Sequence, residues 1–319
     1  MADTVSRRNF LKRSAVVSAG AALAMSLEEK ALMAQLATGA SGDRPPQPVK
    51  GLPTGKIGNL TISRIICGGN LISGFAHSRD LTYISSLLRE YFTDEKVWET
   101  LRICEENGIN TAILRLDDHC LGILNGYWND RGGKIQWIAQ CKMKGDDFKP
   151  DIQQAIDNGA LGAYLHGGEA DKLVGEGRID VLGKAVEFIK QNGVLAGVAG
   201  HMIDVPIACE KARLNVDFYM KTLHSHKYWS AGIMPRNDSV WCETPDKTIE
   251  FMKTVKKPWI AYKVLAAGAI HPKEGFRYAF ENGADFLCVG MFDFQVIEDV
   301  LIARNTLSEK RNRPRAWMA

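Results

Sequence analysis

Residues 179–201 read Ile-Asp-Val-Leu-Gly-Lys-Ala-Val-Glu-Phe-Ile-Lys-Gln-Asn-Gly-Val-Leu-Ala-Gly-Val-Ala-Gly-His, and this stretch holds one complete unit of the fold. Apolar side chains recur at helical spacing over 179–192, and Asn192-Gly193 is a usual left-handed stop after a helix. The run that follows, 195–201, is short and apolar, which is typical of a buried strand. The unit therefore predicts a helix, a tight turn and a strand that ends on a histidine.

The same unit recurs along the chain from about residue 56, with further Asn-Gly stops at Asn107, Asn158 and Asn282. Strands are expected at 62–68, 110–115, 135–142, 161–166, 195–201, 216–223, 259–265 and 285–291, and helices at 94–107, 149–158, 179–192, 207–214, 245–255 and 272–282. Alternating strands and helices imply parallel strands with right-handed crossovers. Eight units in roughly 260 residues predict an α/β fold, a single TIM (β/α)8 barrel over residues 52–319. A doubly wound open sheet is the alternative, but no G-x-G-x-x-G follows the first strand.

The composition excludes several other classes of protein. Of 319 residues, 45% are hydrophobic and 24% are charged, which is ordinary for a globular chain. The net charge of +3 is too small and scattered to indicate nucleic-acid binding. The seven cysteines are odd in number and lack C-x-x-C spacing, so a disulfide framework is not expected.

The first residues carry an export pattern. Ser6-Arg7-Arg8-Asn9-Phe10-Leu11-Lys12 resembles the twin-arginine translocation motif, and residues 15–27 are moderately apolar. We therefore expect a twin-arginine signal over residues 1–37, a flexible linker over 38–51, and export by the twin-arginine machinery to a periplasmic or other extracytoplasmic site. An uncleaved signal would anchor the protein to the membrane. An amphipathic helix with two chance arginines is the alternative.

Histidines close three consecutive predicted strands. His166, His201 and His224 end the fourth, fifth and sixth strands, and the carboxyl ends of barrel strands form the active-site face. Imidazole is the commonest protein ligand of divalent metals. The pattern predicts a Zn²⁺ or Mn²⁺ site on these three residues, with Glu169 or Asp118 as an oxygen ligand. Taken singly, each histidine fits a hydrogen-bonded structural role better than a ligand role, and the convergence of the three favours the metal site.

Other side chains at the same strand ends suggest catalytic and substrate-binding roles. Lys142 or Asp118 would move a proton, and Lys263 would act as a base, hold an oxyanion or form a Schiff base. Arg115 is expected to bind substrate, together with the loop aromatics Trp128, Tyr228 and Trp229, which would suit stacking on a sugar ring. Simple packing of the loops is the alternative for each aromatic.

Four segments, in this order, are similar to the aldo-keto reductase family. They are residues 52–70 (LPTGKIGNLTISRIICGGN), 106–111 (ENGINT), 258–268 (PWIAYKVLAAG) and 284–291 (ADFLCVGM) followed by 295–299 (QVIED). The resemblance implies the same barrel, and it implies carbonyl reduction with NAD(P)H by an Asp, Tyr, Lys and His set. Lys142 and His166 fall at the family's lysine and histidine positions, whereas Ile113 and Asp118 stand at those of the aspartate and tyrosine.

The positions that hold the nicotinamide in that family also differ here. Ala199 and Gly200 replace the Ser-Asn pair, Met220 replaces the glutamine, and Leu223 replaces the stacking tyrosine. The leading hypothesis is therefore an exported, divalent-metal-dependent lyase, isomerase or hydrolase that acts on a sugar-like or small carbonyl substrate. The alternatives are an NAD(P)H-dependent reductase with an altered site, and a non-catalytic barrel that binds a ligand.

Overall fold

A computed structural model of the chain describes residues 51–75, 81, 83–228, 230–231, 241–309 and 313–319. The predicted signal (1–37) and nearly all of the predicted linker (38–51) lie outside these residues, so both stay predictions. No helix in the described part combines the length and apolar character needed to cross a membrane.

Eight parallel strands close into a barrel in the order β10-β3-β4-β5-β6-β7-β8-β9. The strands are β3 (Ile65–Gly68), β4 (Thr111–Arg115), β5 (Gln136–Cys141), β6 (Gly162–Leu165), β7 (Leu195–Gly200), β8 (Phe218–Thr222), β9 (Trp259–Tyr262) and β10 (Phe286–Val289). Sequential strands lie side by side, as right-handed crossovers require. The predicted single TIM barrel is confirmed.

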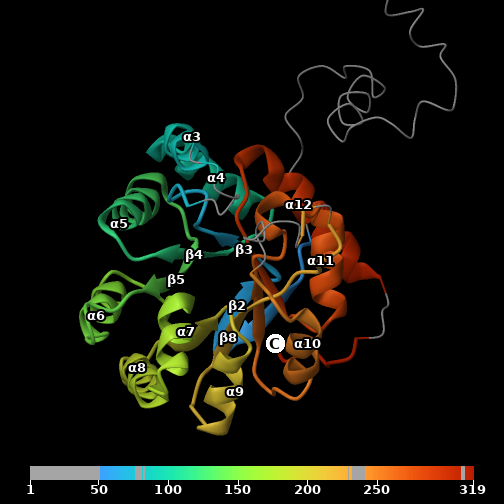
Figure 1. Ribbon diagram of the computed structural model, residues 1–319. Coiled ribbons are helices and arrows are strands. Elements are labelled where there is room, and N and C mark those ends of the chain that lie inside the picture. The colour runs from blue at the N-terminus through green and yellow to red at the C-terminus, as the bar shows by residue number, and fades with distance from the viewer. Residues whose placement is uncertain (1–50, 76–80, 82, 229, 232–240, 310–312) are drawn as a thin grey trace, which may run out of the picture. The chain divides into compact units, whose positions relative to one another are not determined.

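Helices surround the barrel on its outside (Figure 1). They are α3 (Ile84–Tyr91), α4 (Asp94–Glu106), α5 (Asp118–Asn125), α6 (Lys149–Asp157), α7 (Gly167–Gly175), α8 (Ile179–Gln191), α9 (Asp204–Lys211), α10 (Pro245–Met252), α11 (Pro272–Glu281) and α12 (Val296–Ser308), with the π-helical segment η2 (Gly126–Asp130) after α5 and the short 3-10 turns η3 (Ala266–Gly268) and η4 (Asp293–Gln295). The sequence analysis did not predict α3, α5 and α7, which are eight or nine residues long. The last two matter for function, since they begin directly after strand ends.

The expected first strand, 62–68, is divided in the structure. Its first half belongs to an antiparallel hairpin of β1 (Thr54–Ile57) and β2 (Leu60–Ser63), in which Ile57 pairs with Leu60. Ile57 and Ile62 are buried with Ile66 and Phe218 in the cluster that fills the barrel interior. A second, larger cluster lies between the strands and the helices. The hairpin therefore contributes apolar side chains to the barrel core.

The amino ends of β9 and β10 are tied to the last residues of the chain. The fully buried Asp285 carboxylate lies 2.5 Å from Nη1 of Arg315 and accepts the main-chain N–H groups of Trp259 and Met318, both at 2.9 Å. Arg64 donates to the carbonyl oxygen of Asp285 at 3.0 Å. This end of the barrel is thus filled by structural ion pairs and hydrogen bonds, which directs the search for a functional site to the carboxyl ends.

Candidate active site

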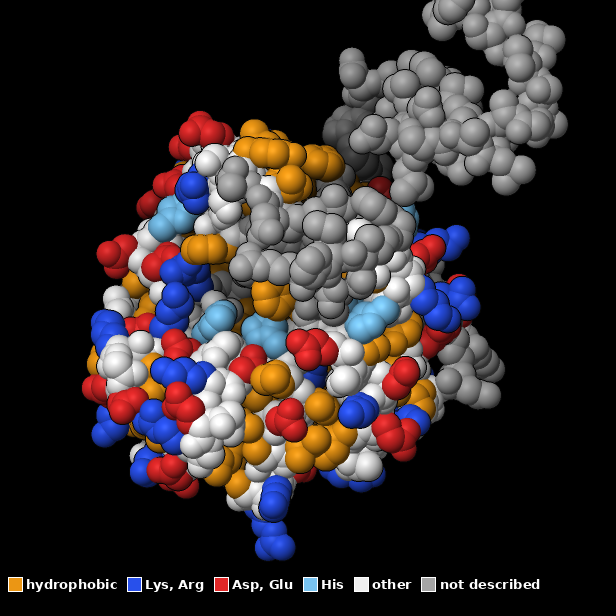
Figure 2. Space-filling view, in the orientation of Figure 1, with side chains coloured by type: hydrophobic (Ala, Val, Ile, Leu, Met, Phe, Trp, Pro, Cys, Tyr) orange, Lys and Arg blue, Asp and Glu red, His pale blue; other side chains and the backbone are white. Residues whose placement is uncertain are grey.

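Three histidines lie at adjacent strand ends, as predicted. His166 directly follows β6, His201 follows β7, and His224 comes two residues after β8. The ring centroids of His166 and His201 are 6.3 Å apart. Figure 2 shows histidine side chains gathered near the middle of one face, beside carboxylates and hydrophobic side chains. The prediction that the three histidines end adjacent strands is confirmed, whereas the groups that the three rings offer differ.

His201 is held by a carboxylate that the sequence analysis missed. Asp171, on α7, lies 2.7 Å from His201 Nδ1 and also accepts the main-chain N–H groups of His201 and Met202, each at 3.0 Å. Burial tends to raise the pKa of the Asp171 carboxyl, but the hydrogen bonds from His201 and Met202 hold it below its ordinary value. In the neutral ring that donates its Nδ1 hydrogen to the carboxylate, Nε2 of His201 carries a lone pair. No hydrogen bond with a described residue uses that lone pair.

His166 presents a hydrogen-bond donor, in contrast to the acceptor nitrogen of His201. Its Nδ1 accepts the N–H of Gly168 at 3.2 Å and so caps the start of α7. Burial, together with the neighbouring His201, Lys142 and Lys263, lowers the pKa of His166 to about 4. The ring is therefore neutral near pH 7, and since Nδ1 is the acceptor, its hydrogen sits on Nε2. His166 is a hydrogen-bond donor toward the barrel mouth, by which we mean the opening at the carboxyl ends of the strands.

His224 has a structural role. It is fully buried, and its Nε2 accepts the N–H groups of Trp241 and Cys242 at 3.0 and 3.1 Å. Its Nδ1 donates to the carbonyl oxygen of Ser225 at 3.0 Å. Burial lowers the pKa of His224 to about 4, so the ring is neutral. Both nitrogens are occupied, and the ring fixes the end of the loop between β8 and α10.

These assignments correct the predicted metal site on His166, His201, His224 and Glu169. A metal needs several lone pairs aimed at one point, whereas both nitrogens of His224 and Nδ1 of His166 are already engaged in hydrogen bonds. Glu169 is half-buried in the first turn of α7. Among the described residues, one group of three possible ligands has its atoms within 4.8 Å of one another, and its members are Asp117, His119 and Cys120.

That group has other functions in the fold. Asp117 accepts the N–H of Cys120 at 2.8 Å as the cap of α5, and its other oxygen lies 2.7 Å from Arg115. Burial raises the pKa of the Cys120 thiol to about 12, which disfavours the thiolate that a metal requires. His119 is exposed and lies 3.2 Å from Asp94. The cluster is explained by helix capping and surface ion pairs.

The structure adds a phenol to the site. The hydroxyl of Tyr262, the last residue of β9, is buried and has no hydrogen-bond partner among the described residues. Its ring centroid lies 5.6 Å from that of His201. Gly167 makes the approach possible, since a Cβ there would lie 2.8 Å from the Tyr262 hydroxyl and 3.1 Å from His201 Cε1. Burial raises the pKa of Tyr262 well above its ordinary value, so the phenol stays protonated.

Lys263 completes the group at the barrel mouth. Its Nζ lies 4.1 Å from the ring centroid of Trp241, and that ring is 5.5 Å from the ring of His201. Burial lowers the pKa of Lys263 to about 7. No ion pair with Lys263 occurs within the described part of the chain. The sequence singled out Lys263 by its position at a strand end, and Trp241 lies in the loop between β8 and α10.

Three other predicted catalytic and binding residues lie at the carboxyl-end rim. Arg115 pairs with Asp117 and stacks on Phe75, with its guanidinium carbon 4.7 Å from the ring centroid. Asp118 is exposed in the first turn of α5, and Lys142 is exposed just after β5. Lys142 is near enough to His166 to affect its pKa. Their catalytic and binding roles stay predictions.

The three aromatic residues predicted to bind substrate have three different outcomes in the structure. Tyr228 is half-buried with its ring 6.1 Å from that of His224, so it lies beside the site. Trp229 falls outside the described residues. The prediction for Trp128 was wrong, because its Nε1 donates to the carbonyl oxygen of Ile135 at 3.0 Å and its ring faces Gly159. Both partners precede strands, which places Trp128 at the amino ends of the barrel.

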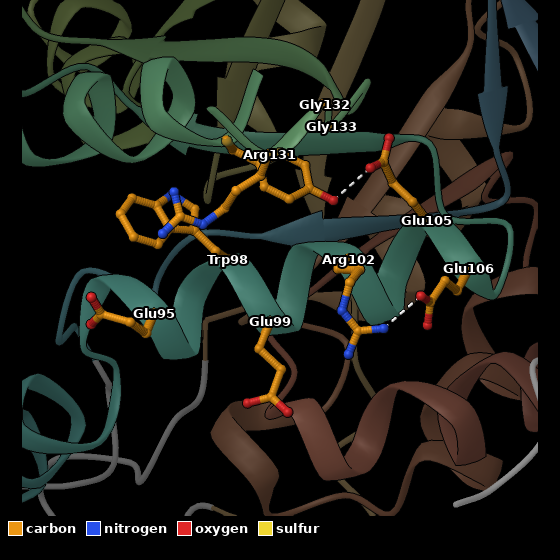
Figure 3. Close-up of a pocket in the computed structure, with 10 residues that line it drawn as sticks. Glu95, Trp98, Glu99, Arg102, Glu105, Glu106, Arg131, Gly132 and Gly133 are labelled. Carbon is orange, nitrogen blue, oxygen red and sulfur yellow. Dashed lines mark hydrogen bonds and ion pairs between the residues drawn. The ribbon is translucent and has the colours of Figure 1, made fainter. Parts of the chain in front are cut away.

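A surface groove of about 400 Å³ lies away from the strand ends, along α4 and η2 (Figure 3). The Arg131 guanidinium covers the face of Trp98, 3.4 Å from the ring centroid, and Tyr127 donates to Glu105 at 2.5 Å. Arg102 pairs with Glu106 at 2.5 Å. The principal polar groups of this groove thus already have partners, and the barrel mouth is the better candidate for an active site.

No family model matches the chain, and no curated protein matches it. Solved structures do match. One, described as an aldo-keto reductase from Pseudomonas aeruginosa, is 15% identical over 80% of this chain and 94% of its own, with a TM-score of 0.58. Another, the holo form of an aldo-keto reductase from Bacillus halodurans, is 14% identical over 82% of this chain and 92% of its own, with a TM-score of 0.52. At these identities the likeness shows a shared fold, which is the barrel that the family resemblance implied.

Proposed function

We propose that this barrel is an enzyme that performs acid–base chemistry on a small carbonyl or hydroxyl compound. His201 would act as the base and Tyr262 as the acid. The observation that carries the proposal is the partly buried Asp171–His201 pair, at 2.7 Å, beside a buried hydroxyl that has no partner among the described residues. A structural histidine uses both nitrogens, as His224 does, whereas His201 keeps one lone pair at the mouth of the barrel.

The charges and protonation states support these roles. The Asp171 carboxylate orients the imidazole and would stabilise the imidazolium that forms when Nε2 takes a proton. Tyr262 remains a phenol at neutral pH and can protonate an oxygen that gains negative charge. The neutral His166 presents an N–H that can bind the same oxygen. Together they suit removal of a proton next to a carbonyl, which is the chemistry of isomerases and lyases.

Hydrogen exchange tests the proposal. The protein is incubated in deuterated water with small ketones and aldehydes, dihydroxyacetone and glyceraldehyde among them, and proton NMR follows loss of the signal next to the carbonyl. We expect exchange in the wild type and a fall of about 10²-fold or more in His201→Asn and in Tyr262→Phe. His119→Asn, at an exposed rim histidine, is the matched control. Exchange that is unchanged in both site variants would refute the assignment.

A second candidate is NAD(P)H-dependent carbonyl reduction, favoured by the solved structures described as aldo-keto reductases. The residues at the expected nicotinamide positions do not fit the cofactor. Ala199 and Met220 are buried apolar side chains inside the barrel, and Leu223 is fully buried in the outer core. They offer no side-chain hydrogen bond to a carboxamide. Titration with NADPH and NADH decides: saturable quenching of tryptophan fluorescence would favour the reductase over a cofactor-free enzyme.

The compartment and the substrate class rest on the sequence. We propose export through the twin-arginine pathway, supported by Arg7 and Arg8, and a sugar-like substrate, supported by the rim aromatics Tyr228 and Trp241. Cell fractionation of the wild type against an Arg7→Lys, Arg8→Lys double variant tests the first point. Retention of the double variant in the cytoplasm, with the wild type outside it, is the expected result.

A further inference from the structure

We propose that Lys263 is a nucleophile that forms an imine with the carbonyl carbon of the substrate, an inference that rests on the proposed function. Lys263 directly follows β9 at the barrel mouth, and its amino group lies over the face of Trp241. It is neither a structural cation nor a surface lysine in the described structure. The substrate class would then be an aldehyde or ketone small enough to enter between Trp241 and His201.

The surroundings of Lys263 differ from those of other half-buried lysines. Lys190 lies 2.6 Å from Asp217 and Lys257 lies 3.1 Å from Glu210, so each of these ammonium groups has a carboxylate. Lys221 is fully buried but lies in the outer layer, where it donates to the Thr222 hydroxyl at 2.8 Å. Lys263 has no carboxylate partner among the described residues, and its burial disfavours the charged form of the amine.

The backbone turns sharply at this residue. Alternation along β9 places Ile260 and Tyr262 in the barrel interior, so a continued strand would send Lys263 outward. Instead Lys263 has a φ of 57°, and Ala266 and Ala267 have φ values of 47° and 54°. Left-handed backbone at residues other than glycine is strained and occurs preferentially at functional sites. The strained turn brings the amine to the mouth, where its charge lowers the pKa of both His166 and His224.

Burial lowers the pKa of Lys263 to about 7. About half of the molecules then carry a neutral amine at neutral pH, roughly a thousandfold more than for an ordinary lysine. In the proposed step the amine nitrogen bonds to the carbonyl carbon, and the carbonyl oxygen leaves as water with the two amine protons. Tyr262 and His166 can relay those protons, and no oxidant or reductant is consumed. His201 would then remove a proton from the adjacent carbon, which an imine acidifies.

Reductive trapping tests the inference on the folded, full-length protein. The protein is treated with dihydroxyacetone and sodium cyanoborohydride over a range of pH, and peptide mass spectrometry measures the labelling rate at each lysine. We expect Lys263 to be labelled about a hundredfold faster than the exposed Lys142 near pH 7, with a half-maximal rate near that pH. Because the wild type reports every lysine, the result does not depend on the folding of a variant. Equal rates at Lys263 and Lys142 would overturn the inference.

Two variants separate this inference from the proposed function. His201→Asn should keep the label on Lys263 and lose hydrogen exchange, whereas Lys263→Arg should lose both. Exchange that persists without any label at Lys263 would overturn the imine and leave the acid–base function standing. A label on Lys263 in a protein that catalyses no exchange would support the nucleophile and contradict the proposed role of His201.

Discussion

Replacing Asp171 by asparagine tests the central pair of the site without any knowledge of the substrate. The side chain keeps its shape but loses its charge and one of its two acceptor oxygens. In the wild type the carboxylate accepts three groups: the His201 Nδ1 hydrogen at 2.7 Å and the N–H groups of His201 and Met202, each at 3.0 Å. The amide can satisfy only part of this set, and its own N–H₂ faces a donor.

The magnitude follows from those contacts. Hydrogen bonds to a charged group contribute about 1.5–3 kcal/mol each, and the asparagine loses one to two of them. We therefore expect Asp171→Asn to lower the free energy of unfolding by about 2–4 kcal/mol near neutral pH. Since the pKa of Asp171 is depressed in the folded state, this stability is present above the unfolded value and is lost as pH falls through the folded value. The gap between wild type and variant should therefore narrow below about pH 4.

Urea unfolding, followed by tryptophan fluorescence near pH 7 and at several values down to about pH 3, measures that gap. Long-range proton–nitrogen NMR of His201 reports which ring nitrogen carries the hydrogen, and we expect Nδ1 in the wild type and a mixture in the variant. Asp180→Asn is the matched control, because Asp180 pairs with Lys184 on the exposed face of α8. The reasoning is refuted if Asp171→Asn behaves like Asp180→Asn, or if the gap is the same at every pH.

Three further outcomes are expected. Tyr262→Phe should abolish hydrogen exchange. It should leave the free energy of unfolding unchanged or raise it by up to about 1 kcal/mol, because it removes a buried hydroxyl with no partner among the described residues. A large destabilisation of this variant in urea unfolding would contradict the assignment. His224→Ala should lower the free energy of unfolding by about 2–5 kcal/mol, since the N–H groups of Trp241 and Cys242 lose their acceptor. The metal content of this variant, measured by atomic spectroscopy, should be the same as that of the wild type. A loss of bound metal would instead support the predicted metal site. Because the pKa of Lys263 is lowered in the folded state, the unfolded chain binds more protons than the folded one between about pH 7 and 10, and the free energy of unfolding of the wild type should rise with pH across that window. Lys263→Met should flatten this rise. Parallel curves of unfolding free energy against pH for the wild type and the variant would exclude a buried amine.

The fold was predictable because its signals are local. The apolar run 195–201 and the stop at Asn192-Gly193 depend on neighbouring residues alone, and the structure has β7 at Leu195–Gly200. The predicted strand bounds were wrong where one local sequence pattern is compatible with two different structures. The run 62–68 was predicted as one strand, but Arg64 within it binds Asp285 and the chain end, so it divides into hairpin and barrel strand.

The candidate site was predictable in position and not in chemistry. A histidine that closes a parallel strand lies at the active-site face whatever its partners are, which is why His166, His201 and His224 were found from sequence. Which lone pair each ring offers depends on groups far along the chain. His201 meets Asp171, 30 residues earlier, and His224 meets Trp241, 17 residues later.

The sequence by itself thus determined a TIM barrel with imidazoles and lysines at its carboxyl ends, because strand period and helix stops are properties of short segments. Only the tertiary structure decided that His201 pairs with Asp171, that His224 is hydrogen-bonded through both ring nitrogens, and that Tyr262 lies beside His201 and Lys263 beside Trp241. Protonation and basicity depend on burial and on hydrogen-bond partners, and both are fixed only when distant segments pack together.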